Sequence, residues 1–221
     1  MRKRLLEIYQ HLLDTYGAQS WWPDESPFEV IVGAILTQSV AWSNVEKAIT
    51  ALKQASLLTP DQLAQAPIEE IAVLIRPCLY YNEKAKKLKA FSSFLENRYS
   101  NNLSFLLSLG VSFLRQELLS VWGIGEETAD AIILYAAKKP SFVVDTYTRR
   151  ILQRLGMIDE KATYTGIRNL VMKSLPADVP LYNEYHALLV RHGKKRCRNR
   201  KPVCTGCPLS TLCKGSGGVA P

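Results

Sequence analysis

Four of the five cysteines stand close together near the end of the chain, at Cys197, Cys204, Cys207 and Cys213. Their spacing is C-x6-C-x2-C-x5-C, and four thiolates in so short a segment can surround one metal centre. Structural zinc sites usually pair two short C-x2-C turns, and only one such turn occurs here. The spacing therefore favours a [4Fe–4S] cluster, with zinc as the alternative.

The compartment expected for the chain agrees with a metal role for these thiols. The first residues, 1–17, have charges between apolar residues at helical spacing, as in an amphipathic helix, and no segment of the chain approaches the length of a membrane span. We therefore expect a cytoplasmic protein, in which cysteines stay reduced. The fifth cysteine, Cys78, is far away in the sequence and fits a buried core thiol.

The loop between the first two clustered cysteines is strongly basic. It contains Arg198, Arg200 and Lys201, and a metal centre that fixes both of its ends would present these cations as a rigid phosphate contact. The alternative is a solvated loop without a partner. The whole chain has 28 Lys and Arg against 20 Asp and Glu, a net charge of +8, which suits a polyanionic partner such as nucleic acid or an anionic membrane face.

A glycine turn separates two apolar helical patterns within residues 118–134. Gly123 and Gly125 allow positive φ and let the backbone approach another surface closely. The backbone N–H groups that open the second pattern could then bind a phosphate. A lone G-x-G turn could also do no more than connect two helices.

Asp145 lies at the end of the apolar run 142–144 and opens an amphipathic helical pattern. This position is typical of a helix N-cap. A carboxylate there stays ionised and firmly oriented, so a capping role is compatible with catalysis.

Aromatic residues flank the apolar segment 28–38. Trp21, Trp22 and Pro23 precede it and Trp42 follows it. Tryptophans usually fill cores, but a pair beside a proline could also line a slot that stacks on a planar base.

The elements that must position these residues are helices. Segments 28–38, 44–54, 69–75 and 84–94 have apolar residues at i, i+3 and i+4 spacing, whereas only 141–144 alternates briefly like a strand. The chain is therefore expected to be all-α. The glycine-rich segment 214–221 is expected to be a flexible tail.

Together these motifs resemble the helix-hairpin-helix glycosylase superfamily, in its endonuclease III branch, from about Leu6 to Cys213. The hairpin motif corresponds to residues 121–129, and the catalytic-aspartate segment corresponds to Val144-Asp145-Thr146. The cluster motif begins at His192-Gly-Lys-Lys-Arg-Cys197, and residues 75–87 resemble the family's "YN-x-KA" helix on the DNA side.

The resemblance implies a two-lobed fold with DNA in the groove between the lobes. One lobe is a six-helix domain over residues 25–134, and the other is an iron–sulfur cluster domain formed by 1–24 and 135–213. Gln38 falls where the family fills the gap left by an extruded nucleotide. The expected DNA-side cations are Lys84, Lys86 and Lys87.

One departure from the family pattern bears on the reaction. Bifunctional members carry a lysine that attacks C1′ at the start of the second hairpin helix, and this chain has Glu127 there, after Glu126. A glutamate cannot form an imine, whereas monofunctional members keep only the aspartate and use water. The resemblance therefore implies hydrolysis by Asp145 without strand cleavage.

Among monofunctional members, the chain most resembles the endonuclease III-related 3-methyladenine glycosylases, through its Trp-Trp-Pro segment, an aromatic at Trp42 and a glutamate at the lysine position. The expected substrate is an alkylated purine in double-stranded DNA, and the expected state is a monomer associated with the nucleoid. Three alternatives remain: a bifunctional enzyme acting on oxidised pyrimidines, a glycosylase for mismatched or deaminated bases, and a non-catalytic DNA-binding iron–sulfur protein.

Overall fold

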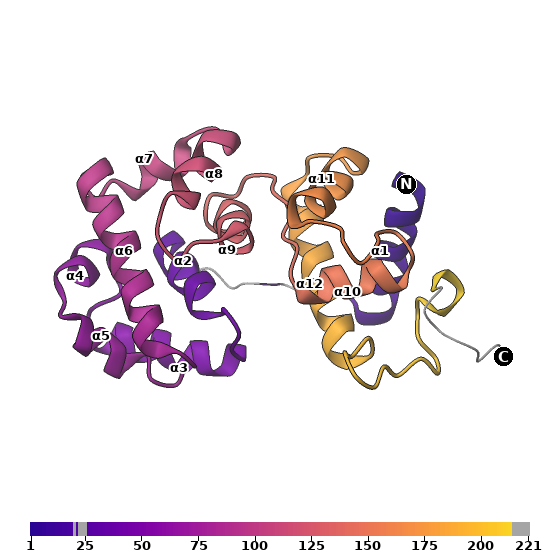
Figure 1. Cartoon of the computed structure of the whole chain (residues 1–221), viewed down its shortest axis with the longest axis horizontal. Coiled ribbons are helices and arrows are strands. Elements are labelled where there is room, and N and C mark those ends of the chain that lie inside the picture. The colour runs from indigo at the N-terminus through magenta and orange to yellow at the C-terminus, as the bar shows by residue number, and fades with distance from the viewer. Residues whose placement is uncertain (20, 22–25, 214–221) are drawn as a thin grey trace. The chain divides into compact units, whose positions relative to one another are not determined.

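The computed structural model describes residues 1–19, 21 and 26–213, and every regular element in these ranges is helical (Figure 1). The all-α expectation is therefore confirmed. Residues 141–144, the brief strand candidate, form a connection outside any regular element. All four of their side chains are buried, so they do not alternate between a core face and a solvent face. The expected tail, 214–221, lies outside the described residues.

The chain divides into two compact units. The terminal unit comprises Met1–Trp21 and Pro140–Pro221, and the central unit comprises Trp22–Lys139. The resemblance placed the boundaries at 24/25 and 134/135. The second boundary falls later, at 139/140, because the π-helical turn η1 (Ile132–Ala136) is buried throughout and packs on α2 within the central unit.

The central unit is built around α2 (Pro27–Leu36), whose residues from Val30 to Leu36 are all buried. The Ser26 hydroxyl accepts a hydrogen bond from the Glu29 N–H, and Pro27 occupies the first helical turn, where its missing N–H costs nothing. The other helices of this unit are α3 (Trp42–Gln54), α4 (Pro60–Gln65), α5 (Ile68–Leu74), α6 (Tyr81–Tyr99), α7 (Leu103–Ser108), α8 (Val111–Leu119) and α9 (Glu126–Ala131).

The terminal unit brings the two ends of the chain together. The amphipathic helix α1 (Arg2–Tyr16) buries Leu5, Ile8 and Leu12 and packs against α12 (Val179–Lys195), as the indigo and orange ribbons show (Figure 1). The buried Tyr185 hydroxyl donates to the Leu5 carbonyl over 2.8 Å, which ties the two helices. The unit also contains α10 (Thr146–Arg154), α11 (Tyr164–Ser174) and the 3₁₀ turn η2 (Ser210–Leu212).

Among the described residues, no helix is both long enough and apolar enough to cross a bilayer.

Candidate functional site

Asp145 is the N-cap of α10, as its position in the sequence predicted. Its Oδ1 accepts a hydrogen bond from the Thr148 backbone N–H over 2.7 Å. The buried run 142–144 leads directly into this residue and anchors the backbone beneath it. The carboxylate is therefore held at a defined place at the start of an amphipathic helix.

The second carboxylate oxygen of Asp145 faces a histidine from another helix. Oδ2 lies 3.7 Å from Nε2 of His186 on α12, and only 12% of the Asp145 side chain is exposed. Burial raises the pKa of Asp145, but the nearby His186 imidazole and the hydrogen bond from the Thr148 N–H outweigh burial and lower this pKa below its ordinary value. The carboxylate is thus ionised at neutral pH.

The glycine turn of the central unit has two different glycines. Gly123 has φ +86°, which only glycine adopts readily, and a Cβ there would lie 2.4 Å from Cγ of Lys87. Gly125 has φ −90° and open space where a side chain would be. The conformation of the turn therefore requires glycine at position 123. At position 125 a Cβ would meet no other atom of the protein, so the space beside the turn is open there.

Gln38 is tied to this turn. Its Nε2 donates to the Gly123 carbonyl over 3.3 Å and to the Thr128 hydroxyl over 3.0 Å. Its Oε1 accepts a hydrogen bond from the Lys87 ammonium. The residue expected to enter DNA is thus positioned beside the hairpin.

The first turn of α9 is acidic. Arg115 pairs with Glu126 over 3.0 Å and with the fully buried Asp130 over 3.1 Å, so that two carboxylates are compensated by one guanidinium. Glu127, at the position where bifunctional members carry lysine, is exposed. Its carboxylate places negative charge, and no amine, at this end of the helix.

The three lysines expected on the DNA side differ in exposure. Lys86 is exposed and pairs with Glu83, and Lys87 is half-buried. Lys84 is only 2% exposed, and its Nζ donates to the Leu36 carbonyl at the end of α2 over 2.8 Å. Burial lowers the pKa of Lys84. The expectation that Lys84 contacts phosphate is therefore wrong, because its ammonium is used inside the core.

The two described tryptophans of the candidate base-stacking set belong to different units. Trp21 belongs to the terminal unit, where the Lys194 ammonium lies 5.9 Å from its ring centroid. Trp42 is half-buried at the first position of α3 in the central unit. Trp22 and Pro23 lie outside the described residues. The stacking slot therefore stays a prediction.

The basic loop presents its side chains to solvent while its backbone is held by α10. Arg198, Arg200 and Lys201 are all exposed. Arg154, the last residue of α10, donates to the carbonyls of Arg198 over 2.8 Å and Asn199 over 2.9 Å. The helix that Asp145 begins thus ends on this loop.

The four clustered cysteines line one hollow, together with Arg154 and His192. The Arg154 guanidinium lies 3.2 Å from Sγ of Cys197, and Nε2 of His192 lies 3.8 Å from Sγ of Cys207. The described residues contain no group of three or more His, Cys, Asp or Glu gathered closely enough to hold one metal ion. Four cysteine sulfurs that line one hollow, beside the Arg154 cation that can offset thiolate charge, are a donor set that could hold a metal centre.

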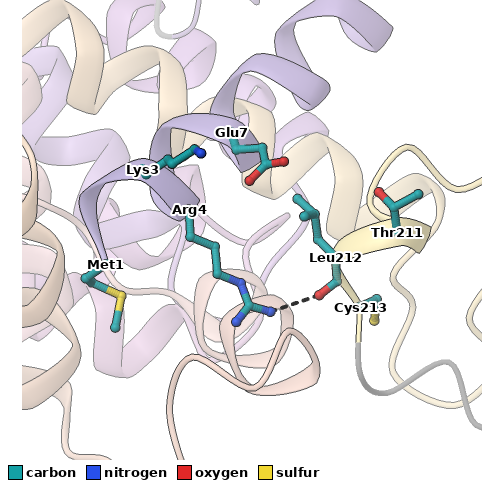
Figure 2. A pocket seen from close by; sticks show the side chains of 7 residues that line it. All are labelled: Met1, Lys3, Arg4, Glu7, Thr211, Leu212 and Cys213. Atoms are coloured by element: carbon teal, nitrogen blue, oxygen red, sulfur yellow. Dashed lines mark hydrogen bonds between the residues drawn. The ribbon is translucent and has the colours of Figure 1, made fainter.

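A second hollow of the terminal unit lies between the start of α1 and η2 (Figure 2). Arg4 reaches from α1 and donates to the Leu212 carbonyl over 2.9 Å and to the Leu155 carbonyl over 2.6 Å. The remaining residues that line it are Met1, Lys3, Glu7, Thr211 and Cys213. Arg4 therefore fastens the end of the cysteine segment to α1, and Asp145 does not line this hollow.

Three residues of the site were missed by sequence reasoning. His186 is one buried position in an amphipathic pattern, and nothing in the spacing pairs it with Asp145. Arg154 is likewise one cation among many. Trp122 is 57% exposed beside the glycine turn, and its sequence signal was its place in the hairpin motif, where no role was assigned to it.

Comparison with known proteins identifies the class. Residues 32–177 match the family described as "HhH-GPD superfamily base excision DNA repair protein". The chain is 47% identical over 210 residues to a Methanocaldococcus jannaschii protein whose name assigns it provisionally to the DNA repair glycosylases, covering 95% of each chain. It is 31% identical to endonuclease III of Sulfolobus acidocaldarius, covering 85% of this chain and 81% of that one. A thymine-DNA glycosylase of Aeropyrum pernix is 26% identical, covering 96% and 92%.

Solved structures agree on the fold. A non-covalent endonuclease III–DNA complex superposes with a TM-score of 0.83 at 23% identity, covering 97% of this chain and 96% of that one. The H. pylori 3-methyladenine DNA glycosylase bound to 1,N6-ethenoadenine gives 0.74 at 27% identity, covering 88% and 97%. The chain belongs to the HhH-GPD superfamily of base excision DNA repair proteins. It is an enzyme, a DNA N-glycosylase.

Proposed function

We propose that this enzyme is a monofunctional glycosylase, which hydrolyses the N-glycosidic bond of a damaged base and leaves the DNA strand intact. The observation that carries the proposal is the ionised, N-capping carboxylate of Asp145, together with a glutamate, Glu127, at the position of the family's nucleophilic lysine. A carboxylate can activate water, whereas without an amine there is no route to an imine at this position.

The chemistry begins with an extruded nucleotide. Turning a base out of the duplex costs a few kcal/mol in stacking and pairing, which phosphate contacts must offset. Cleavage of the glycosidic bond passes through an oxocarbenium-like sugar. The Asp145 carboxylate stabilises that positive charge and orients or deprotonates the attacking water, a contribution of about 10²–10⁴ in rate for a positioned general base.

The phosphate contacts that would hold the DNA are assigned to exposed cations. The exposed Arg198, Arg200 and Lys201 of the basic loop and Lys86 on α6 would bind phosphates. The turn at Gly123 and Gly125 would meet the backbone of the duplex, and Gln38 would fill the space of the extruded nucleotide. We expect this enzyme to work as a monomer on the nucleoid.

The proposed substrate is an alkylated purine such as 3-methyladenine. A cationic base is a good leaving group that needs little acid catalysis, and it gains about 0.5–2 kcal/mol by stacking on tryptophans such as Trp21, Trp22 and Trp42. The likeness to the H. pylori 3-methyladenine glycosylase supports this choice. A mismatched or deaminated base is the second candidate, because the relative named thymine-DNA glycosylase aligns with 96% of the chain.

The proposed cofactor is a [4Fe–4S] cluster held by Cys197, Cys204, Cys207 and Cys213. Its contribution would be structural: it would close both ends of the basic loop, which Arg154 already holds by its carbonyls. The cluster assignment is tested by measuring the amounts of iron and acid-labile sulfide per chain. Zinc in place of both would overturn it. Cys78→Ala serves as the control variant: because Cys78 lies in the central unit, this substitution should leave the iron and sulfide contents as in the wild type.

The test of the substrate is a set of duplexes, each with one lesion: 3-methyladenine, ethenoadenine, an oxidised pyrimidine, uracil, or thymine opposite guanine. Free base released in a single turnover is measured for the wild type and for Asp145→Asn. We expect release from the alkylated purine, and a loss of about 10²-fold or more in the variant. Equal rates for the two proteins would contradict the role of Asp145, and release of another base alone would contradict the substrate.

A further inference from the structure

A buried histidine faces the candidate catalytic carboxylate from a helix that sequence analysis did not connect with it. His186 lies within α12 and is 7% exposed. Its Nε2 is 3.7 Å from Oδ2 of Asp145. Helix α12 comes close to α10 in this region, since a Cβ on Gly193 would lie 2.3 Å from the Tyr147 ring. The approach is thus a packed helix–helix contact between α10 and α12.

The two oxygens of Asp145 have different surroundings. Oδ1 accepts the Thr148 N–H and so completes the cap of α10. Oδ2 is left for chemistry, but one hydrogen bond does not determine the rotation of a carboxylate, because this terminal torsion is broad. The His186 Nε2 lies 3.7 Å from Oδ2, slightly beyond hydrogen-bond length, so that a small movement would let the imidazole supply the second constraint.

Burial makes this second constraint necessary. An ionised carboxylate with 12% exposure pays a large desolvation cost unless donors or opposite charge compensate it. From α10 the compensation is the Thr148 N–H, and from α12 it is His186. From α11, the Tyr164 hydroxyl accepts the N–H of Val144, one residue before the carboxylate. Of these groups, His186 is the one whose side chain lies beside Oδ2 from another helix.

We propose that His186 is the positioning residue of Asp145: its Nε2–H holds Oδ2 in one orientation and keeps the carboxylate ionised while its oxygen faces the reacting sugar and water. This inference rests on the proposed function, because Asp145 must be the reacting carboxylate for positioning to matter. His186 itself does not touch the substrate.

A histidine that merely fills space has different consequences. Replacement would then lower stability and reduce the rate equally at every pH. A positioning histidine sets the pKa of Asp145, so that its loss leaves a buried carboxylate without compensation and raises that pKa. The pH profile therefore separates the two roles.

The experiment compares His186→Leu, which removes the donor, with His186→Gln, whose amide places a donor near the position of Nε2. The pKa of Asp145 is measured first, by carbon NMR of the carboxyl group in full-length protein without DNA. We expect His186→Leu to raise this pKa by about one unit or more, and His186→Gln to restore at least half of the change.

Single-turnover base release is then measured between about pH 5 and about pH 7. The wild-type rate should stay level, the His186→Leu rate should fall toward low pH, and the His186→Gln rate should lie between them, with duplex affinity unchanged in all three. An unchanged Asp145 pKa in His186→Leu, or equal effects of both substitutions, would overturn the proposal. Absence of base release from every wild-type reaction would instead refute the proposed function, while the NMR pKa still decides whether His186 governs Asp145.

Discussion

Lysines 84, 86 and 87 lie within about one turn of α6, yet their ammonium groups end in three different places. One donates to a carbonyl at the end of α2, one pairs with Glu83 at the surface, and one donates to Gln38. The basic pattern alone marks all three as DNA contacts. Only packing distinguishes them, because the last carbonyls of a helix have no partner within it and accept a hydrogen bond from any donor that can reach them.

This difference gives a prediction for two alanine variants. Lys84→Ala should lower the free energy of unfolding by about 2 kcal/mol, since the Leu36 carbonyl loses its donor, while the salt dependence of DNA binding stays as in the wild type. Lys86→Ala should change stability by less than about 0.5 kcal/mol, since its ion pair is exposed, but should reduce the slope of log K against log salt by about 0.9. Chemical denaturation and binding titrations at several salt concentrations measure both. A smaller slope in a folded Lys84→Ala protein would speak against the buried role.

At the scale of the elements, α10 joins the parts of the site that belong to the terminal unit. Asp145 caps its start, and Arg154 at its end holds the loop that contains Arg198. Apolar periodicity predicted such helices well, and the cap of α10 followed from an acidic residue after an apolar run. The contact of α10 with His186 was not predictable, because periodicity says which face of a helix is buried but not which residue of another helix lies opposite.

The two glycines of the hairpin allow its stability and its DNA contact to be tested separately, by comparing an alanine variant at each position. Gly123→Ala should destabilise the protein by about 1–3 kcal/mol, because φ is +86° there and the new Cβ meets Lys87. Gly125→Ala should leave the melting temperature nearly unchanged, since its φ is −90° and the space beside it is open in the free protein. We expect Gly125→Ala to weaken duplex binding several-fold, because the methyl group would stand between the turn and the DNA backbone. Wild-type affinity in Gly125→Ala would argue that the turn does not meet DNA.

At the scale of the whole molecule, the fold class and the membership of the superfamily could be anticipated from motifs that extend from about Leu6 to Cys213. Two aspects could not. The boundary after Lys139 depends on the burial of η1, a tertiary effect, and the π-helical form of that turn has no signal in its apolar letters. The lesion is also undetermined by sequence, since pocket shape arises from several side chains whose spacing in the chain is unrelated.

The net charge of +8 acts on the molecule as a whole. It favours encounter with any DNA, damaged or not, and this attraction weakens as salt increases. Selection among bases must therefore come from the step in which the nucleotide leaves the stack and meets Asp145, rather than from the first encounter.

In the proposed reaction water, and no amine of the protein, attacks the sugar. The most direct measurement takes the lesion duplex that releases base fastest, incubates it with enzyme and borohydride, and analyses parallel samples without borohydride before and after alkali. For hydrolysis by water we expect no protein–DNA adduct, and strand breaks that appear only after alkali. A borohydride-trapped adduct, or breaks in equal amount to released base without alkali, would contradict it and would assign the nucleophile to a lysine elsewhere in the chain.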